Sequence, residues 1–139
     1  MRSQAGFTFT ELLAVATLTA MLAAVAVPRY AMINSETRST AVRALAANVK
    51  SSATLTNKVW QAAGQPTRMQ FDGHDVEMRY GYPTELSIDE IVVMSADFRF
   101  EDGYFKHAQT AAGQGCAVLY IPPPNPDREA SVISYTNGC

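Results

Sequence analysis

Hydrophobic residues dominate the beginning of the chain, and one acidic residue interrupts them. From residue 7 to residue 27 the sequence is apolar apart from four threonines and Glu11. As an α-helix this stretch would be roughly 30 Å long, which is the thickness of the hydrocarbon core of a bilayer. The pattern predicts a helix that can span a membrane and that carries a carboxylate close to its start.

An amphipathic pattern follows Pro28, which ends the apolar run. Apolar positions recur at steps of three and four residues, and polar residues lie between them. Gly64 and Pro66 then provide a helix stop. We therefore predict one long helix over residues 7–62, weakened at Pro28, whose second half packs on a core. The buried stripe is expected to contain Val42, Leu45, Val49, Ala53, Thr56 and Trp60.

Short apolar–polar alternations separated by turn residues follow the helix and predict antiparallel strands. Asp72-Gly73 and Asp102-Gly103 each separate two such segments, which predicts two hairpins. Further strands are expected over residues 116–121 and 132–135. The expected fold class is α+β, with one long N-terminal helix whose second half packs on a small antiparallel sheet.

The connections between these strands carry their own patterns. Gly81-Tyr82-Pro83 predicts a turn. The stretch from Ser87 to Glu90 has the form of a capping box, which predicts a short helix over residues 91–94. The prolines between residues 122 and 126 predict an exposed loop.

Length, charge and cysteine content limit the possible classes of protein. The chain has 139 residues, about the size of one domain. Its formal net charge is −2, and it has no basic stripe, so nucleic acid is not expected as a partner. The two cysteines, Cys116 and Cys139, would stay reduced in the cytosol, but behind an export segment they predict a disulfide. In the chain-entropy model that bond contributes on the order of 3 kcal/mol.

No pattern in the sequence indicates a catalytic or cofactor site. No Gly-x-Ser-x-Gly motif or phosphate-binding glycine loop occurs. His74 and His107 have no second ligand at metal-binding spacing and are expected at the surface. We therefore expect no enzyme activity, no metal and no cofactor. Carboxylates expected to be solvated rather than to bind calcium are Asp72, Asp75, Asp89, Glu90, Glu101 and Asp102. Aromatic residues expected to fill the core rather than to stack on carbohydrate or bases are Trp60, Tyr80, Tyr82, Phe98, Phe100, Tyr104 and Phe105.

The apolar N-terminal stretch allows three interpretations. A secretory signal peptide could be cleaved after Ala24-Val25-Ala26, releasing a soluble periplasmic binding domain that starts at Val27. Against this, Glu11 lies at the edge of the apolar core. An uncleaved anchor is the second interpretation, although charges in membrane segments are costly and tend to be functional. The third interpretation follows from the residues around Gly6.

A short polar leader ending in Gly6 precedes Phe7 and the run Thr8-Phe9-Thr10-Glu11-Leu12-Leu13. This stretch resembles the N-terminus of type IV pilins, of the type IVa-like kind, and of the related type II secretion pseudopilins. The resemblance implies that a prepilin peptidase cuts after Gly6 and that the new amine of Phe7 is methylated. Thr10 departs from the family, which more often has valine or isoleucine there.

The resemblance also implies a division of the chain and a place in the cell. Residues 1–6 would be a leader that is removed, residues 7–28 a transmembrane and filament-core helix, and residues 29–139 a globular head. The precursor would lie in the bacterial inner membrane, and the assembly machinery would then polymerise it into a surface fibre for adhesion or motility. The expected partners are copies of the same chain, the prepilin peptidase, the assembly machinery and the inner membrane. The family's head plan includes a C-terminal disulfide loop.

Several roles within this family remain open at the level of sequence. The stretch from Asp72-Gly73 to Gly81-Tyr82-Pro83, with the cysteine pair, bears a weaker likeness to mannose-sensitive haemagglutinin pilins. Pseudopilins typically lack such a disulfide, which favours a pilus subunit. The alternatives are a minor pilin, a type II secretion pseudopilin, or the soluble binding domain described above.

Glu11 has a physical role under the pilin interpretation. Cleavage before Phe7 creates a positive amine one helical turn before Glu11. Both charges are costly alone in an apolar bundle and much less so when paired. Glu11 of one subunit could therefore neutralise the amine of its neighbour and fix their axial offset. Glu11 and Pro28 are the residues expected to act in assembly.

Overall fold

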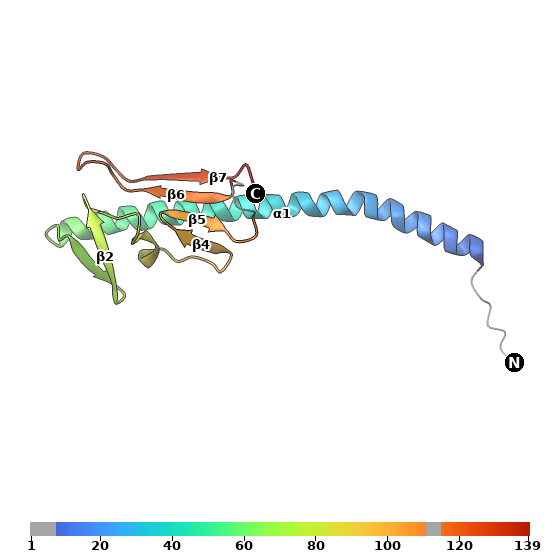
Figure 1. The fold of residues 1–139 in the computed structure, drawn as a ribbon, viewed down its shortest axis with the longest axis horizontal. Coiled ribbons are helices and arrows are strands. Elements are labelled where there is room, and N and C mark those ends of the chain that lie inside the picture. The colour runs from blue at the N-terminus through green and yellow to red at the C-terminus, as the bar shows by residue number, and fades with distance from the viewer. Residues whose placement is uncertain (1–7, 111–114) are drawn as a thin grey trace. The chain divides into compact units, whose positions relative to one another are not determined.

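One long helix is followed by seven strands in the part of the chain that the structure describes (Figure 1). The structure is a computed structural model. It describes residues 8–110 and 115–139, except for the side chains of residues 25, 27, 28 and 30–32. The elements are α1 (Phe9–Ala62), β1 (Arg68–Phe71), β2 (His74–Arg79), β3 (Tyr82–Pro83), the 3₁₀ helix η1 (Ile88–Ile91), β4 (Phe98–Glu101), β5 (Tyr104–His107), β6 (Ala117–Ile121) and β7 (Ser131–Tyr135).

The chain divides into two compact units, and α1 runs through both. One unit ends at Glu36, and the other, which we call the head, extends from Thr37 to Cys139. The backbone is helical on either side of Pro28. The side chain of Pro28 lies outside the described residues, so the weakening and the assembly role assigned to it stay predictions.

The strands of the head form two antiparallel sheets rather than the single one expected. One sheet has the order β1-β2-β3 and the other β4-β5-β6-β7. Turns and η1 occupy the residues between β3 and β4, and these residues separate the two sheets. The α+β class, with a long helix packed on antiparallel strands, is confirmed.

The second half of α1 supplies one side of the core. Val42 and Val49 are fully buried, and Leu45, Ala53 and Thr56 are nearly so. Trp60 is half-buried, so the predicted stripe is confirmed along its length. The sheets and η1 supply the other side through Ile88, Phe98, Phe105, Val118 and Tyr120. Because the stripe repeats at helical spacing, one largely apolar face of α1 extends over about five turns and packs on the head.

Three two-residue hairpin turns connect strands, and all three have positive φ at both residues. They are Asp72-Gly73, Tyr80-Gly81 and Asp102-Gly103. This conformation is a type I′ turn, which matches the twist of the strands. The two hairpins predicted at Asp-Gly are confirmed. The turn predicted at residues 81–83 is wrong by one residue, because Arg79 pairs with Tyr82 and leaves Tyr80-Gly81 as the turn.

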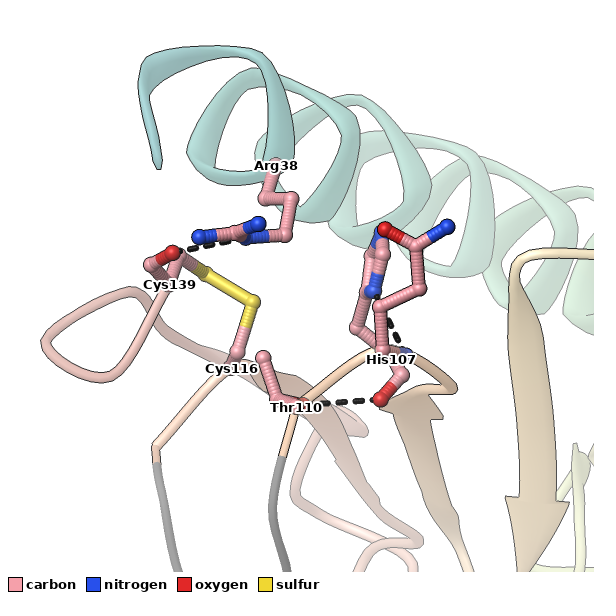
Figure 2. The surroundings of a disulfide bond; sticks show 6 residues. Arg38, His107, Thr110, Cys116 and Cys139 are labelled. Atoms are coloured by element: carbon pink, nitrogen blue, oxygen red, sulfur yellow. Dashed lines mark hydrogen bonds between the residues drawn. A yellow bond between two sulfur atoms is a disulfide. The ribbon is translucent and has the colours of Figure 1, made fainter. Parts of the chain in front are cut away.

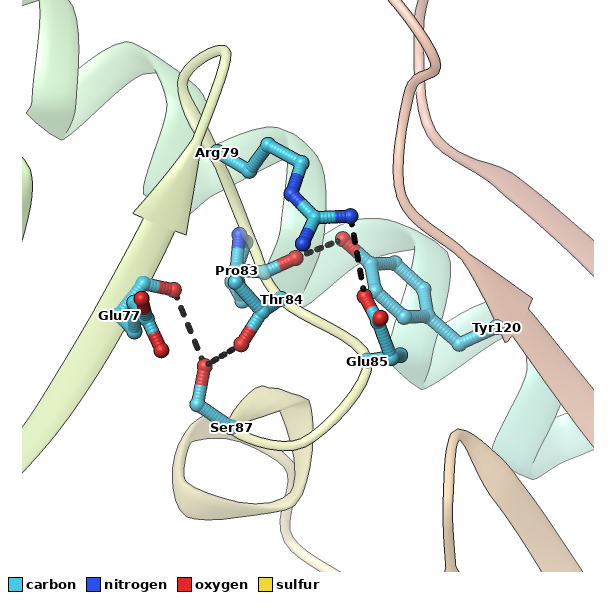
Figure 3. A network of polar contacts seen from close by, with 7 residues as sticks. All are labelled: Glu77, Arg79, Pro83, Thr84, Glu85, Ser87 and Tyr120. Carbon is cyan, nitrogen blue, oxygen red and sulfur yellow. Dashed lines mark hydrogen bonds and ion pairs between the residues drawn. The ribbon is translucent and has the colours of Figure 1, made fainter.

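The predicted capping box at Ser87 is also wrong. The Ser87 side chain makes no cap hydrogen bond, and the short helix is η1 rather than residues 91–94. The Ser87 hydroxyl instead donates to the carbonyl of Glu77 at 3.0 Å and lies 2.9 Å from the Thr84 hydroxyl (Figure 3). The serine therefore ties the turn after β3 back to β2.

A buried hydroxyl joins the two sheets. Tyr120 on β6 donates to the carbonyl oxygen of Pro83 on β3 at 2.8 Å (Figure 3). Burial raises the pKa of Tyr120, so the group remains a donor at any physiological pH. Beside it, Arg79 forms an ion pair with Glu85 at 3.6 Å. Because this buried hydroxyl stays hydrogen-bonded to the Pro83 carbonyl, it fixes the position of β6 relative to β3.

The proline-rich connection after β6 is not wholly exposed, contrary to expectation. Pro123 is fully buried, while Pro124, Asn125 and Pro126 are exposed. Arg128 N–H donates to the Asn125 carbonyl at 3.3 Å, which closes a turn. The loop is therefore held at its start by the buried Pro123 and closed into a turn between Asn125 and Arg128.

Candidate functional site at the start of the long helix

The predicted processing site lies at the very start of the chain. Gly6 and Phe7 fall outside the described residues, which begin with Thr8. Their assigned roles, cleavage after Gly6 and methylation of Phe7, stay predictions. Glu11 is described, and its surroundings show what the carboxylate does before any neighbour is present.

Thr8 and Glu11 form a capping box. The Thr8 backbone N–H donates to Glu11 Oε2 at 2.9 Å, and the Thr8 hydroxyl donates to the same oxygen at 2.7 Å. In return the Glu11 N–H donates to Thr8 Oγ1 at 3.4 Å. Each side chain satisfies a backbone donor of the first turn that has no partner within the helix. This role of Thr8 was not among the predictions from the sequence, although Thr-x-x-Glu is the spacing that indicates it.

Large apolar side chains are exposed on every side of the first half of α1. Their exposed fractions lie between 49% for Leu13 and 74% for Phe9. A helix that is apolar all round is normally covered by lipid or by other helices. The exposed side chains are Phe9, Leu12, Leu13, Val15, Leu18, Met21 and Leu22.

Thr17 and Thr19, two of the four threonines in the apolar stretch, bond their hydroxyls to the helix backbone. Thr17 donates to the carbonyls of Leu13 and Ala14 at 3.1 and 2.9 Å. Thr19 does the same with Val15 and Ala16 at 2.8 and 3.0 Å. Since both hydroxyls are bonded within the helix, neither needs water. Threonine at these positions is therefore compatible with an apolar environment.

The comparison with protein families identifies this segment. Residues 1–27 match the family model of the prokaryotic N-terminal methylation motif. The match covers the predicted cleavage point, the capping box and the apolar run. It supports a type IV pilin-like family and fits a pilin and a pseudopilin equally. No curated protein and no solved structure matches the chain.

The N-terminal methylation motif carries implications for processing and for chemistry. It implies cleavage by a prepilin peptidase and handling by a pilus-type assembly machinery. Proteins of this kind are structural subunits rather than catalysts. Among the described residues, no helix is long and apolar enough to cross a membrane. The expected membrane span over residues 7–28 stays a prediction.

The disulfide predicted behind an export segment is present. Cys116 and Cys139 are bonded, with their Cα atoms 4.8 Å apart. Figure 2 shows the bond beside α1, where Arg38 Nε donates to the Cys139 carbonyl at 2.7 Å. The Gly138 N–H donates to the Gly115 carbonyl at 2.9 Å. The segment that ends at Cys139 is therefore tied both to the base of β6 and to the helix.

The two histidines differ in their surroundings, and the surface position expected for His107 is wrong. His107 is buried at 6% exposure, with its ring 5.2 Å from that of Phe98 and its Nδ1 accepting from the Gln109 N–H at 3.3 Å. Its backbone N–H donates to the Cys116 carbonyl at 3.1 Å, which places His107 near the disulfide (Figure 2). His74 is more exposed, and its Nδ1 lies 2.6 Å from Glu90 Oε2.

The carboxylates of the head form no metal site in the described part of the chain. Asp89 alone departs from the expected solvated surroundings, because one of its oxygens is buried without a hydrogen-bond partner. Burial raises the pKa of Asp89 above its usual range.

Proposed function

We propose that this protein is a structural subunit of a type IV pilus. In this proposal residues 1–6 are removed, residues 7–28 hold the precursor in the inner membrane, and the same helix later forms the filament core. The globular part of the chain, predicted over residues 29–139, covers the outside of the fibre. The observation that carries the proposal is the N-terminal methylation motif on a helix whose apolar side chains are exposed on all sides.

Glu11 gives the proposal a mechanism for ordered assembly. Its carboxylate is already held by Thr8, at the N-terminal end of the helix. Cleavage would create an amine at Phe7, four positions before Glu11 in the sequence, and in a bundle a second copy could bring its own amine to the carboxylate. The pair is favourable only when both charges meet, so it selects one axial offset between subunits. The capping box keeps the carboxylate in one position until that happens.

The disulfide favours a pilus subunit over a pseudopilin. Pseudopilins typically lack a C-terminal disulfide loop, whereas Cys116 and Cys139 close one here. A minor pilin or a pseudopilin is the alternative within the family. The uncleaved N-terminus and the soluble periplasmic domain starting at Val27 are the alternatives outside it.

Mass analysis of the mature protein tests the processing step. We expect the purified membrane or fibre protein to begin at Phe7 and to carry one methyl group on its amine. A chain that begins at Val27 would instead support the soluble binding domain. A chain that keeps Met1 to Gly6 would support a plain anchor. The Gly6→Ala variant, expected to stay uncleaved, provides the matched control.

Two substitutions at Glu11 separate charge pairing from helix capping. Glu11→Gln keeps an oxygen that can accept from the Thr8 N–H but loses the charge, whereas Glu11→Ala loses both. We expect each variant to be cleaved normally and to reduce sheared fibres at least about tenfold, since an unpaired buried amine costs several kcal/mol. Quantifying the protein in sheared fibres and membranes measures this. Normal fibre yield from Glu11→Gln would assign Glu11 to capping alone.

A further inference from the structure

A groove in the head lies far along the chain from the methylation motif. It has a volume of about 560 Å³ and lies between the end of α1, the β2–β3 turn and the loop that precedes β7. Figure 1 shows these three elements gathered at the same end of the head. They are distant in sequence, so the groove exists only in the folded protein. It belongs to the head alone and takes no part in the proposed assembly contact.

Three aromatic side chains line the groove, and one of them is fixed on two sides. Trp60 donates its indole N–H to the Pro66 carbonyl at 2.8 Å, and the backbone of Gly81 lies against its six-membered ring. Tyr82 is nearly buried, while Tyr80 is 46% exposed. The groove therefore has a rigid aromatic wall and a more accessible aromatic rim.

The loop that precedes β7 adds charged side chains of both signs to the lining of the groove. Asp127, Arg128 and Glu129 line the groove. In residues 8–110 and 115–139, none of the three takes part in a hydrogen bond or ion pair through its side chain. The loop that carries them is shaped by the turn between Asn125 and Arg128. The groove thus offers free acceptors and free donors side by side.

Tyr80 occupies a backbone conformation that a tyrosine rarely adopts. Its φ is +50°, in the left-handed region. The equivalent positions of the other two type I′ turns, Asp72 and Asp102, carry one of the residues that this conformation favours. A bulky residue with positive φ is an outlier, and such outliers concentrate at ligand sites. Tyr80 therefore occupies the rim despite backbone strain, which asparagine at the same position would reduce.

We propose that this groove binds a neutral saccharide. Aromatic rings offer flat apolar surfaces that suit the C–H faces of a sugar ring, and sugar hydroxyls need both donors and acceptors. The carboxylates of Asp127 and Glu129 supply acceptors, and the guanidinium of Arg128 supplies donors. A cation would face Arg128, and an anion would face two carboxylates, so this loop favours an uncharged ligand. The inference goes beyond the proposed function and holds for a pilin and for a pseudopilin.

Fluorescence tests this directly, because Trp60 is the single tryptophan of the chain. The full-length protein would be titrated with trisaccharides of the common neutral hexoses and of N-acetylglucosamine. A polyoxyethylene detergent should be used, since a glycoside detergent is itself a saccharide. We expect a saturable change in Trp60 emission with at least one trisaccharide. Choline chloride and sialyllactose serve as the charged comparisons and should give no saturable change.

The variant Tyr80→Asn separates binding from folding. It places a favoured residue in the type I′ turn, so the midpoint of urea unfolding should stay the same or rise. Losing the rim aromatic should weaken saccharide binding on the order of tenfold. Asp102→Asn changes the same position of a turn outside the groove and is the matched control. The double variant Asp127→Asn with Glu129→Gln changes the loop that precedes β7 instead of the turn, and it should weaken binding at least as much.

Several results would overturn the proposal. One is the absence of a saturable change with every neutral trisaccharide. Another is binding of choline alone, which would make the groove a cation site. A third is unchanged saccharide affinity in both Tyr80→Asn and the double variant, which would place the sugar elsewhere. None of these results depends on whether fibres form, so they are distinguishable from failure of the proposed function.

Discussion

The Gly81→Ala substitution is expected to lower the free energy of unfolding by about 2–4 kcal/mol, because two costs add at this position. An alanine at φ +84° would pay the left-handed penalty of roughly 1 kcal/mol. Its Cβ would also lie 2.5 Å from Asn57 Nδ2 and 2.6 Å from Trp60 Cε3. Overpacking of this kind typically costs about 1–3 kcal/mol.

The neighbours of Gly81 cannot move away without losing hydrogen bonds. Asn57 Nδ2 donates to the Gly81 carbonyl at 2.9 Å, and Trp60 is held by Pro66. Gly73→Ala is the matched control, since Gly73 has φ +87° and no atom within 4 Å of an added Cβ. Urea unfolding of the full chain, followed by Trp60 fluorescence, measures both variants. Equal destabilisation by the two would show that the contact with α1 contributes nothing.

Replacing both cysteines with alanine is expected to destabilise the head by about 2–5 kcal/mol, the usual effect of removing a native disulfide. Cys116 and Cys139 are separated by 23 residues, so the bond restricts a substantial loop in the unfolded chain. Both residues are buried, which makes alanine a fair replacement that adds no unsatisfied hydroxyl. Urea unfolding of Cys116→Ala/Cys139→Ala against the oxidised wild type measures the loss.

Arg38→Gln serves as the comparison for the cysteine variant. It removes the guanidinium that donates to the Cys139 carbonyl but leaves the disulfide in place. The loss of one such hydrogen bond is worth about 1–2 kcal/mol. If the cysteine variant loses no more stability than Arg38→Gln does, the bond adds little beyond the local contact.

The sequence predicted the parts of the fold that depend on local pattern. The buried stripe on α1 follows from helical spacing, and the Asp-Gly hairpins follow from residues that favour positive φ. The third hairpin was displaced in the prediction because Tyr80 is an unfavourable residue for the turn it occupies. The local sequence pattern predicts a helix cap at Ser87. Its hydroxyl contacts Glu77 and Thr84 instead, and these contacts form only in the folded head.

The candidate sites also differ in whether they depend on local sequence or on tertiary packing. The leader, Phe7 and Glu11 form a contiguous motif, so the sequence alone could indicate them. The spacing of Thr8 and Glu11 equally indicates the capping role of Thr8, because a capping box is a local pattern. The groove could not be predicted, because Trp60, Tyr80 and Glu129 come together only through tertiary packing. The burial of His107 has the same origin.

The bond between Cys116 and Cys139 also determines how the head responds to tension. A chain pulled from its two ends unravels into extended backbone at roughly 3.5 Å per residue. The 22 residues between Cys116 and Cys139, which lie 23 positions apart, cannot contribute to that lengthening, since the covalent bond carries the force past them. The bond thereby prevents roughly 80 Å of extension. The segment that cannot extend contains β6 and β7. In a subunit of a load-bearing fibre, that part of the head would stay short even after the rest had yielded.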